Sequence, residues 1–215
     1  ASLNAVSRGS WVAYARQLES TGVDGLDLNV YIMGTNPDRP GAELEQELLD
    51  IVASVKAEVK IPVAVKMSPY YASTLNLAVE LDKRGVEALV LFNRFVRPTI
   101  DIETETLQSK MFYSSPEEMR LSLNRVARIY GHIKADMALN TGVHSGADVA
   151  RALLVGATVV QVASVLYIHG IPYLSTMLRE LEAWMGEKGY ESLADFRGKM
   201  SQKNCDDPFA FERAQ

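Results

Sequence analysis

The chain has 215 residues, of which 47% are hydrophobic and 23% are charged, and this balance is typical of a globular protein with one sizeable core. Its formal net charge of −5, with dispersed basic residues, argues against a nucleic-acid surface, so we expect a small-molecule partner. A single cysteine, the lack of an apolar run of about 18 residues and the lack of a leader-like start favour a cytoplasmic protein without a membrane segment.

Short apolar runs alternate along the chain with longer stretches of helical period, which is the pattern of repeated βα units. The predicted strands are residues 1–4, 25–30, 61–67, 87–93, 136–140 and 158–163. The predicted helices are residues 10–21, 42–58, 72–85, 116–131, 146–155 and 171–187. The spacing is typical of an eightfold barrel, but two units are lacking. We therefore predict an α/β fold, a TIM-type (β/α)8 barrel of which about six βα units are visible.

One segment interrupts this repeat after the fourth predicted strand. Residues 94–115 contain TIDIETET, whose alternation of period two predicts a small β-ribbon inserted at the mouth of the barrel. No low-complexity linker divides the chain, so we predict a partial barrel over residues 1–200 and a polar tail over 201–215. Six strands cannot close an eight-stranded cylinder. We therefore expect either that strands are missing from this chain or that it pairs with another copy as a homodimer.

Four predicted strands stop at asparagine, namely at Asn4, Asn29, Asn93 and Asn140. In parallel α/β folds the carboxyl ends of the strands build the site, so we expect these amides at one rim. An amide both donates and accepts hydrogen bonds, and a ring of amides suits a planar heterocycle such as a flavin or a pyrimidine. The alternative is that asparagine is simply common where strands become turns.

Lys66 stands at the end of the continuous apolar run IPVAVKM. Its stem is therefore expected to start in the barrel interior, where its ammonium group needs an anion. A cation at this place could stabilise negative charge on a reduced flavin or an enolate, or it could form a Schiff base as in aldolases. The alternative is a lysine on the rim that only reaches solvent.

Small residues follow the last two predicted strands in the segment 139–164, LNTGVHSGADVARALLVGATVVQVAS. Gly142 comes after one strand, and Ala163 and Ser164 come after the next. Barrels of this kind bind phosphate at the loops after their last two strands. Free backbone N–H groups and one hydroxyl therefore predict a phosphate site here.

The three histidines carry weaker signals. His144 lies in the predicted phosphate loop and could touch a ligand, although a solvent-facing or capping role is the alternative. His132 and His169 show no metal-ligand spacing with each other or with carboxylates, so we predict no metal site.

Four segments of the chain resemble one known family. They are VKMSP at 65–69, FN at 92–93, TGVHSGADVARALLVGATVVQVAS at 141–164 and GYESLADFRGK at 189–199. The family is dihydroorotate dehydrogenase, in particular its soluble, cytoplasmic class 1 form. The resemblance runs over about residues 1–200 and implies an FMN-binding (β/α) barrel in which this chain begins at the third strand. It also implies dihydroorotate or orotate as the small-molecule ligand and pyrimidine biosynthesis as the pathway.

The resemblance implies roles for individual residues. Lys66 matches a lysine that contacts the flavin ring, and Asn93 matches an asparagine shared by flavin and substrate. The phosphate-binding loops of the family match Gly142, Val143, Ala163 and Ser164. The family usually has Gly-Gly and Gly-Thr where this chain has Thr-Gly and Ala-Ser, so the backbone N–H groups and one hydroxyl are retained.

Asn29 matches the first residue of the family's catalytic loop motif, Asn-Leu-Ser-Cys-Pro-Asn, and is thereby implied to bind the substrate. In this chain Ile32 occupies the position of the catalytic base and Gly34 that of the second asparagine. Isoleucine cannot accept a proton. The resemblance implies an FMN-dependent oxidoreductase acting on the CH–CH group of dihydroorotate or of a related substrate. Two alternatives stay open: a non-catalytic relative that binds FMN or a pyrimidine, and an aldolase or lyase that uses Lys66 for a Schiff base.

Overall fold

The computed structural model describes residues 1–95, 98–109 and 112–213. Residues 96–97 and 110–111 of the predicted insertion, and 214–215 of the predicted tail, lie outside the described residues. The centre of the molecule is a six-stranded parallel sheet with the order β1-β2-β3-β4-β7-β8. The strands are β1 (Ser2–Leu3), β2 (Leu26–Leu28), β3 (Val63–Met67), β4 (Ala88–Leu91), β7 (Asp136–Leu139) and β8 (Val159–Val160). The predicted partial (β/α) barrel is confirmed.

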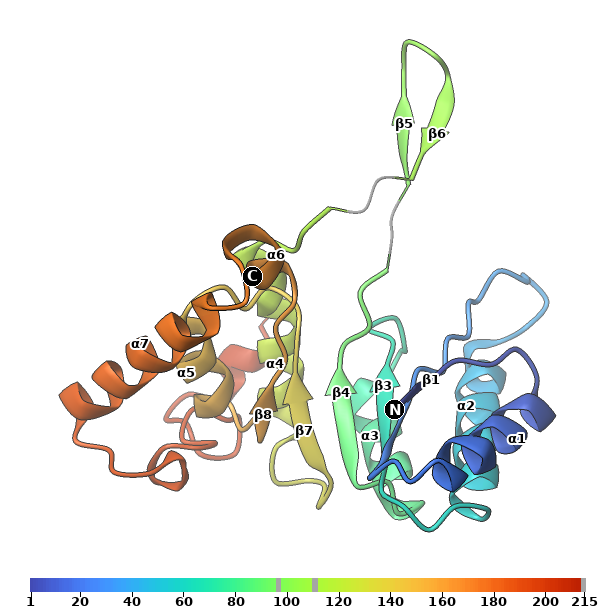
Figure 1. Ribbon diagram of the computed structural model, residues 1–215, viewed down its shortest axis with the longest axis horizontal. Helices are drawn as coiled ribbons and strands as arrows, with labels where there is room; N and C mark the ends of the chain where they lie inside the picture. Colours follow the sequence, from blue (N-terminus) through green and yellow to red (C-terminus); the bar gives the residue numbers. More distant parts are fainter. Residues whose placement is uncertain (96–97, 110–111, 214–215) are drawn as a thin grey trace.

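Helices follow each strand of this sheet and flank it in Figure 1. They are α1 (Arg8–Ser20), α2 (Gly41–Lys56), α3 (Thr74–Lys83), α4 (Met119–Ile129), α5 (Gly146–Leu154), α6 (Ser164–His169) and α7 (Tyr173–Lys188). The short 3-10 turns are η1 (Pro116–Glu118), η2 (Leu193–Asp195) and η3 (Pro208–Phe211). None of the described helices is both long and apolar enough to cross a membrane.

Alternation along the strands divides the sheet into two faces. In β3, Val63, Val65 and Met67 are fully buried in the hydrophobic core, whereas Ala64 and Lys66 between them are half-buried. Successive side chains of a strand point to opposite faces, so the second pair lies on the face away from the core. The small and polar residues therefore line the interior face of the barrel.

The sheet is open on one side in the described part of the chain. Strands β1 and β8 are its two edges, and no pairing joins them. Val159 on β8 is 53% exposed, although it is an aliphatic residue of a strand. An edge strand leaves one row of N–H and C=O groups to water or to a partner. The interior face is consequently accessible between these two edges.

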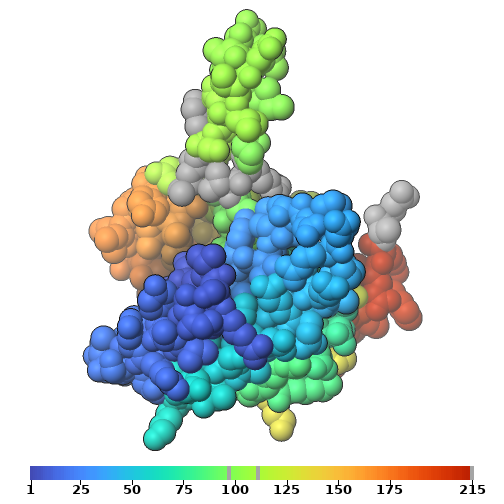
Figure 2. Space-filling view, turned by 90° about the vertical axis from the view of Figure 1, so that its right-hand side faces the viewer, coloured from blue at the N-terminus to red at the C-terminus, as the bar shows by residue number. Residues whose placement is uncertain are grey.

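The insertion after β4 contains the predicted ribbon. Strand β5 (Thr99–Asp101) pairs antiparallel with β6 (Thr106–Gln108), and Ile100 stands opposite Leu107. The side chains of Ile100 and Leu107 are 67% and 73% exposed, respectively. The hairpin stands away from the body of the molecule in Figures 1 and 2. The ribbon prediction is thus confirmed, including its place after the fourth strand of the sheet.

The element boundaries differ from the prediction in three places. The predicted strands are longer than the paired segments. The predicted strand 158–163 pairs with β7 over Val159–Val160, and the N–H groups of Thr158 and Gln161 on either side still donate to carbonyl oxygens of β7. The predicted helix 116–131 is η1 followed by α4, because Pro116 and a capping box between Ser115 and Glu118 shape its start. Helix α6 was not predicted, since its six residues are too few to show a period.

Residues 201–213, expected as a polar tail, fold back onto α4. The N–H of Gln202 donates to the carbonyl of Ala127 at 3.0 Å. The side chain of Asn124 donates to the carbonyl of Phe211 at 3.1 Å, and the ring of Phe211 packs against the hydrophobic core. The structure therefore includes this segment in the folded body.

Candidate functional site

The strand-end asparagines lie at the carboxyl rim of the sheet, as predicted. The backbone N–H groups of Asn29, Asn93 and Asn140 each donate to a carbonyl oxygen of the neighbouring strand, at 2.8 to 3.0 Å. Each of these bonds continues the ladder just beyond the paired strand residues. Asn4 also follows its strand, but its side chain is exposed. The backbone thus holds three amide side chains at the place where parallel barrels build their sites.

Two of these amides contact each other. The side-chain nitrogen of Asn93 donates to the side-chain oxygen of Asn29 at 2.7 Å, across 64 residues of sequence. The bond joins the loop after β2 to the loop after β4. The side-chain oxygen of Asn93 can then accept a hydrogen bond from a ligand, and the side-chain nitrogen of Asn29 can donate one to it. Such a pair suits a ligand edge that carries both a donor and an acceptor.

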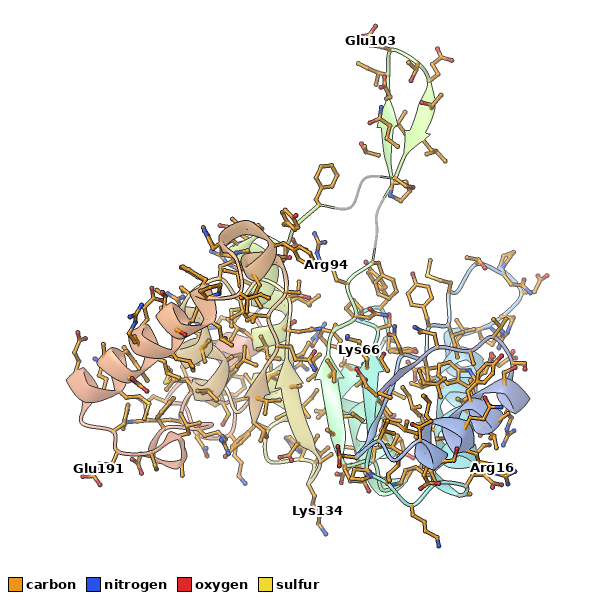
Figure 3. All side chains as sticks on the ribbon, in the orientation of Figure 1. Arg16, Lys66, Arg94, Glu103, Lys134 and Glu191 are labelled. Carbon is orange, nitrogen blue, oxygen red and sulfur yellow. The ribbon has the colours of Figure 1, made fainter. Side chains whose placement is uncertain are left out.

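A cavity of about 520 Å³ opens beside this pair. All six residues expected at the cofactor line it, namely Lys66, Asn93, Gly142, Val143, Ala163 and Ser164. The other lining residues are Arg94, Ser114, Asn140, Thr141, Gln161 and Val162. Lys66 and Arg94 lie in the middle of the molecule in Figure 3. The cavity therefore contains two cations, several amides and the backbone of both predicted phosphate loops.

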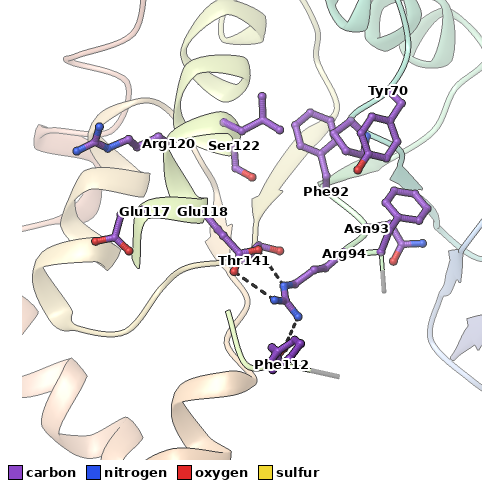
Figure 4. A pocket seen from close by; sticks show the side chains of 13 residues that line it. Tyr70, Phe92, Asn93, Arg94, Phe112, Glu117, Glu118, Arg120, Ser122 and Thr141 are labelled. Atoms are coloured by element: carbon purple, nitrogen blue, oxygen red, sulfur yellow. Dashed lines mark hydrogen bonds and ion pairs between the residues drawn. The ribbon is translucent and has the colours of Figure 1, made fainter. Parts of the chain in front are cut away.

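A second cavity of about 600 Å³ adjoins the first and shares Asn93, Arg94 and Thr141 with it. Its wall is rich in aromatic rings and includes part of α4 (Figure 4). The aromatic and aliphatic lining residues are Tyr70, Phe92, Phe95, Phe112 and Leu121. Such a wall suits a flat or apolar group. The two cavities together are larger than a single planar ring requires.

Arg94 lines both cavities, and its guanidinium group binds the end of the insertion that leads into α4 (Figure 4). Its Nε donates to a carboxylate oxygen of Glu118 at 3.0 Å, and its Nη2 donates to the other at 3.2 Å. It also donates hydrogen bonds to the carbonyl oxygens of Phe112 and Tyr113. The guanidinium therefore ties the loop after β4 to the segment that leads into α4. Sequence reasoning did not single out this residue.

The loop 29–34 has no strong base in reach of the cavity. Ile32 is half-buried against the hydrophobic core, and it lines neither rim cavity. Tyr31 packs on Phe95 with ring centroids 4.4 Å apart, and Phe95 packs on Tyr70 at 5.2 Å. Desolvation raises the pKa of the Tyr31 hydroxyl, and the nearby Tyr70 raises it further. Tyr31 therefore stays protonated at neutral pH and can donate a hydrogen bond.

Asp27 lies on the interior face of the barrel, one strand away from Lys66. One of its carboxylate oxygens is buried without a hydrogen-bond partner. Burial raises the pKa of this carboxyl above its ordinary value of 3.8, while Lys66 and the amino group of Ala1 lower it. The desolvation outweighs the two cations, so the ionised carboxylate is less favourable in the folded state than in the unfolded state.

Replacement of this carboxylate is expected to change the pH dependence of stability. Because the folded pKa is raised, the protonated form stabilises the fold at low pH, and this contribution is lost as the pH rises through the folded pKa. Asp27→Asn should therefore gain stability relative to the parent as the pH rises from about 4 to about 6. Urea denaturation across this range measures the difference, with the exposed Asp24→Asn as the control. If the difference in free energy of unfolding between Asp27→Asn and the parent does not change with pH, the raised pKa of Asp27 is contradicted.

Thr141 and Gly142 both adopt left-handed backbone conformations in the loop after β7, with φ of 70° and 78°. Threonine rarely adopts such a conformation, and strained residues of this kind are enriched at binding sites. A Cβ atom on Gly142 would lie 2.5 Å from the backbone nitrogen of Met119 and 2.8 Å from the carbonyl oxygen of Ser115. Only glycine therefore allows this loop to pack against the start of α4.

Gly142→Ala is expected to lower the free energy of unfolding by about 2–6 kcal/mol, because backbone strain and steric overlap each contribute about 1–3 kcal/mol. Chemical denaturation of the purified variant measures this loss. Gly186→Ala is the matched control, since Gly186 lies in α7 and its added Cβ would meet no atom within 4 Å. The control should gain up to about 1 kcal/mol from helix propensity. Equal stabilities of the two variants would contradict the packing argument.

Three further residues line the 520 Å³ cavity but were not among those expected to bind the cofactor, and one of them, Asn140, was expected only at the rim. Asn140 was noted as a strand-end amide, and its side-chain oxygen is buried without a partner. Gln161 follows β8 on the interior face, and Ser114 comes from the insertion. Periodicity could have identified Gln161, whereas nothing local identifies Ser114. Among the described residues, no three His, Cys, Asp or Glu side chains gather in a way that could hold a metal ion.

The fold is that of a partial (β/α)-barrel protein, with two adjoining cavities at the carboxyl rim of its strands. The particular family follows from comparison with known proteins. A sequence model described as dihydroorotate dehydrogenase matches residues 2–185 of this chain. The chain belongs to the dihydroorotate dehydrogenase family.

Curated proteins that resemble this chain include dehydrogenases at low sequence identity. A chloroplastic dihydropyrimidine dehydrogenase (NADP(+)) of Arabidopsis thaliana is 27% identical, over 91% of this chain and 50% of the relative. The catalytic subunit of a dihydroorotate dehydrogenase B (NAD(+)) of Caldicellulosiruptor saccharolyticus is 24% identical, over 94% of this chain and 68% of the relative. The chain spans about half the length of the plant protein.

Proposed function

We propose that this chain is the FMN-binding barrel of an oxidoreductase that acts on the CH–CH group of dihydroorotate or of a related dihydropyrimidine. The observation that carries this proposal is the 520 Å³ cavity, where Lys66, Asn93 and the two small-residue loops meet. The names of the relatives support both substrates, since one is a dihydropyrimidine dehydrogenase and another a dihydroorotate dehydrogenase.

The residues of the cavity fit a flavin mononucleotide. The buried side-chain oxygen of Asn140 lacks a partner, and a ring N–H would supply one. Lys66 and Asn93 are suited to the ring, and the loops at Gly142 and Ser164 are suited to the phosphate. FMN, when bound, accepts a hydride equivalent from the substrate. Lys66 would stabilise the negative charge that this leaves on the cofactor.

The substrate is proposed to contact the paired amides of Asn29 and Asn93. Their hydrogen bond of 2.7 Å orients both side chains and leaves one donor and one acceptor for a pyrimidine edge. The adjoining 600 Å³ cavity supports a substrate that is not restricted to the size of dihydroorotate. Ile32 and Gly34 replace the base and the second amide of the family motif, which also supports a related substrate.

A second candidate function is a non-catalytic protein that binds FMN or a pyrimidine. It is favoured by Ile32, which packs against the core and carries no group that could accept a proton. This candidate differs from the first in its flavin chemistry alone. A bound flavin that no substrate reduces would favour it.

The assembly and the location of the protein stay predictions. The open edges at β1 and β8 support the prediction of a homodimer or of further strands that cover them. Light scattering of the purified chain tests the first of these. A cytoplasmic location, and the expectation of small-molecule partners rather than nucleic acid or membrane, were drawn from composition.

The test of the proposed function uses the purified 215-residue chain. After incubation with FMN and removal of free flavin, the protein is expected to retain about one FMN molecule per chain, measured by flavin absorbance. Anaerobic addition of dihydroorotate, dihydrouracil or dihydrothymine should then bleach the flavin with at least one substrate. Retained flavin without bleaching by any of the three supports the non-catalytic candidate. Loss of all flavin on gel filtration contradicts the proposal.

A further inference from the structure

The interior face of the sheet carries a carboxylate that the proposed chemistry does not use. Asp27 stands on β2 between Leu26 and Leu28, which both belong to the hydrophobic core, so its own side chain points to the opposite face. One of its oxygens is buried without a hydrogen-bond partner. Such an atom is costly to bury, and it often marks a functional role.

Lys66 lies above Asp27 on the same face, toward the cavity. Asp27 pairs in register with Ala64, which precedes Lys66 by two residues on β3. A strand rises about 3.3 Å per residue, so the backbone of Asp27 lies about 6–7 Å deeper in the barrel than that of Lys66. The side chain of Lys66 lines the 520 Å³ cavity. Seen from the cavity, the carboxylate is therefore behind the lysine.

The strand residues beside this pair are apolar. Ala88 and Val90 of β4 pair with the two interior residues of β3. Charges among apolar groups are screened less than charges in water. Asp136 is the other acidic residue of the six strands, and it is exposed. The buried acid nearest to Lys66 in the strand register is thus Asp27.

The two charges act on each other. Burial raises the pKa of Asp27, whereas Lys66 and the amino group of Ala1 lower it. The attraction is mutual, so the carboxylate also offsets part of the positive field that Lys66 presents to the cavity. The sequence led us to expect an anion for the Lys66 ammonium group, and Asp27 supplies one from below.

We propose that Asp27 sets the reduction potential of the bound flavin by offsetting the charge of Lys66. This inference rests on the proposed function, because it requires FMN beside Lys66. The substrate gives a hydride equivalent to the flavin, which becomes one charge more negative, and the substrate releases its second hydrogen as a proton. Lys66 stabilises the added charge, and Asp27 opposes it. Asp27 acts through Lys66 and is therefore a positioning residue rather than a catalytic one.

The first test is the midpoint potential of the bound FMN, measured by anaerobic equilibration with a reference dye at neutral pH. Asp27→Asn should raise this potential by about 30 mV or more, which corresponds to a tenfold stronger preference for reduced over oxidised FMN. Asp27→Glu keeps the charge and should restore the potential of the parent. Asp24→Asn removes an exposed carboxylate just before the same strand, and this matched control should leave the potential unchanged.

A double-mutant cycle shows whether Asp27 acts through Lys66. In Lys66→Met the carboxylate lacks its cation and binds a proton more readily, so adding Asp27→Asn should shift the potential less than about half as much. The amino group of Ala1 is present in all four proteins, and its contribution cancels. An unchanged potential in Asp27→Asn, or an equal shift in both backgrounds, overturns the inference while the proposed function stands.

A measurement without flavin decides the inference where a variant fails to fold or to retain FMN. The carboxyl carbon of Asp27, assigned through the backbone signals of β2, is titrated by NMR in the parent and in Lys66→Met. The pKa should be higher in Lys66→Met, because Lys66 no longer lowers it. Equal pKa values would show that the two charges do not interact, and the inference would fall. If the parent retains no FMN, the proposed function fails and the flavin role of Asp27 fails with it.

Discussion

Anaerobic mixing of the FMN-loaded chain with excess dihydroorotate is expected to bleach the flavin slowly or not at all. Ile32 stands where the family motif has its base, and its side chain packs against the core. A missing general base costs about 10²–10⁴ in rate. Stopped-flow absorbance of the oxidised flavin band measures the rate. Orotate should still perturb the flavin spectrum, because binding through Asn29 and Asn93 does not need a base.

The variant Ile32→Cys sharpens this prediction. It supplies a thiol at the expected position but should not restore full activity, because Gly34 still lacks the amide of the second motif asparagine. Val30→Cys, two residues before Ile32 at a buried position, controls for the mere presence of a thiol. Rapid bleaching of the parent chain at ordinary enzymatic rates, about 1–10³ s⁻¹, would show that another residue accepts the proton. The assignment of this loop would then be wrong.

Lys66→Ala is expected to weaken FMN retention or to slow flavin reduction, by about 10-fold or more. The reason is the loss of a charge-assisted contact, which contributes about 1.5–3 kcal/mol in a partly buried site. Fluorescence titration measures the affinity, and anaerobic photoreduction measures the reduction rate without any substrate. Lys60→Ala is the matched control, because Lys60 precedes the same strand but is exposed.

Lys66 also acts on its neighbour in the interior. Because Lys66 lowers the pKa of Asp27, its removal should raise that pKa further and make the folded state less stable as the pH rises. Denaturation of Lys66→Ala at about pH 5 and pH 7 separates this effect from flavin binding. If the variant holds and reduces FMN like the parent, Lys66 has no role at the flavin. A Schiff-base role for Lys66 would instead appear as borohydride trapping of a carbonyl substrate on this residue.

The local pattern of the sequence determined most of the sheet and the residues of its rim. Lys66, at the end of the apolar run IPVAVKM, was expected to start in the barrel interior, and it lies on the face away from the core. The strand ends at Asn29, Asn93 and Asn140 predicted the rim, since parallel strands all finish on the same side. The hairpin was predictable from the alternation in TIDIETET. Each of these features depends only on neighbours in the chain.

Contacts between distant loops were decided by the tertiary structure alone. Arg94 meets Glu118 across 24 residues, and Ser114 meets Ser164 across 50 residues. The end of the chain packs on α4 through Phe211, although the sequence there reads as a polar tail. No periodicity encodes such contacts, because they depend on the register of the strands and on how closely neighbouring loops approach. The sequence by itself therefore determined which residues reach the rim, and the packing of the barrel decided which of them meet.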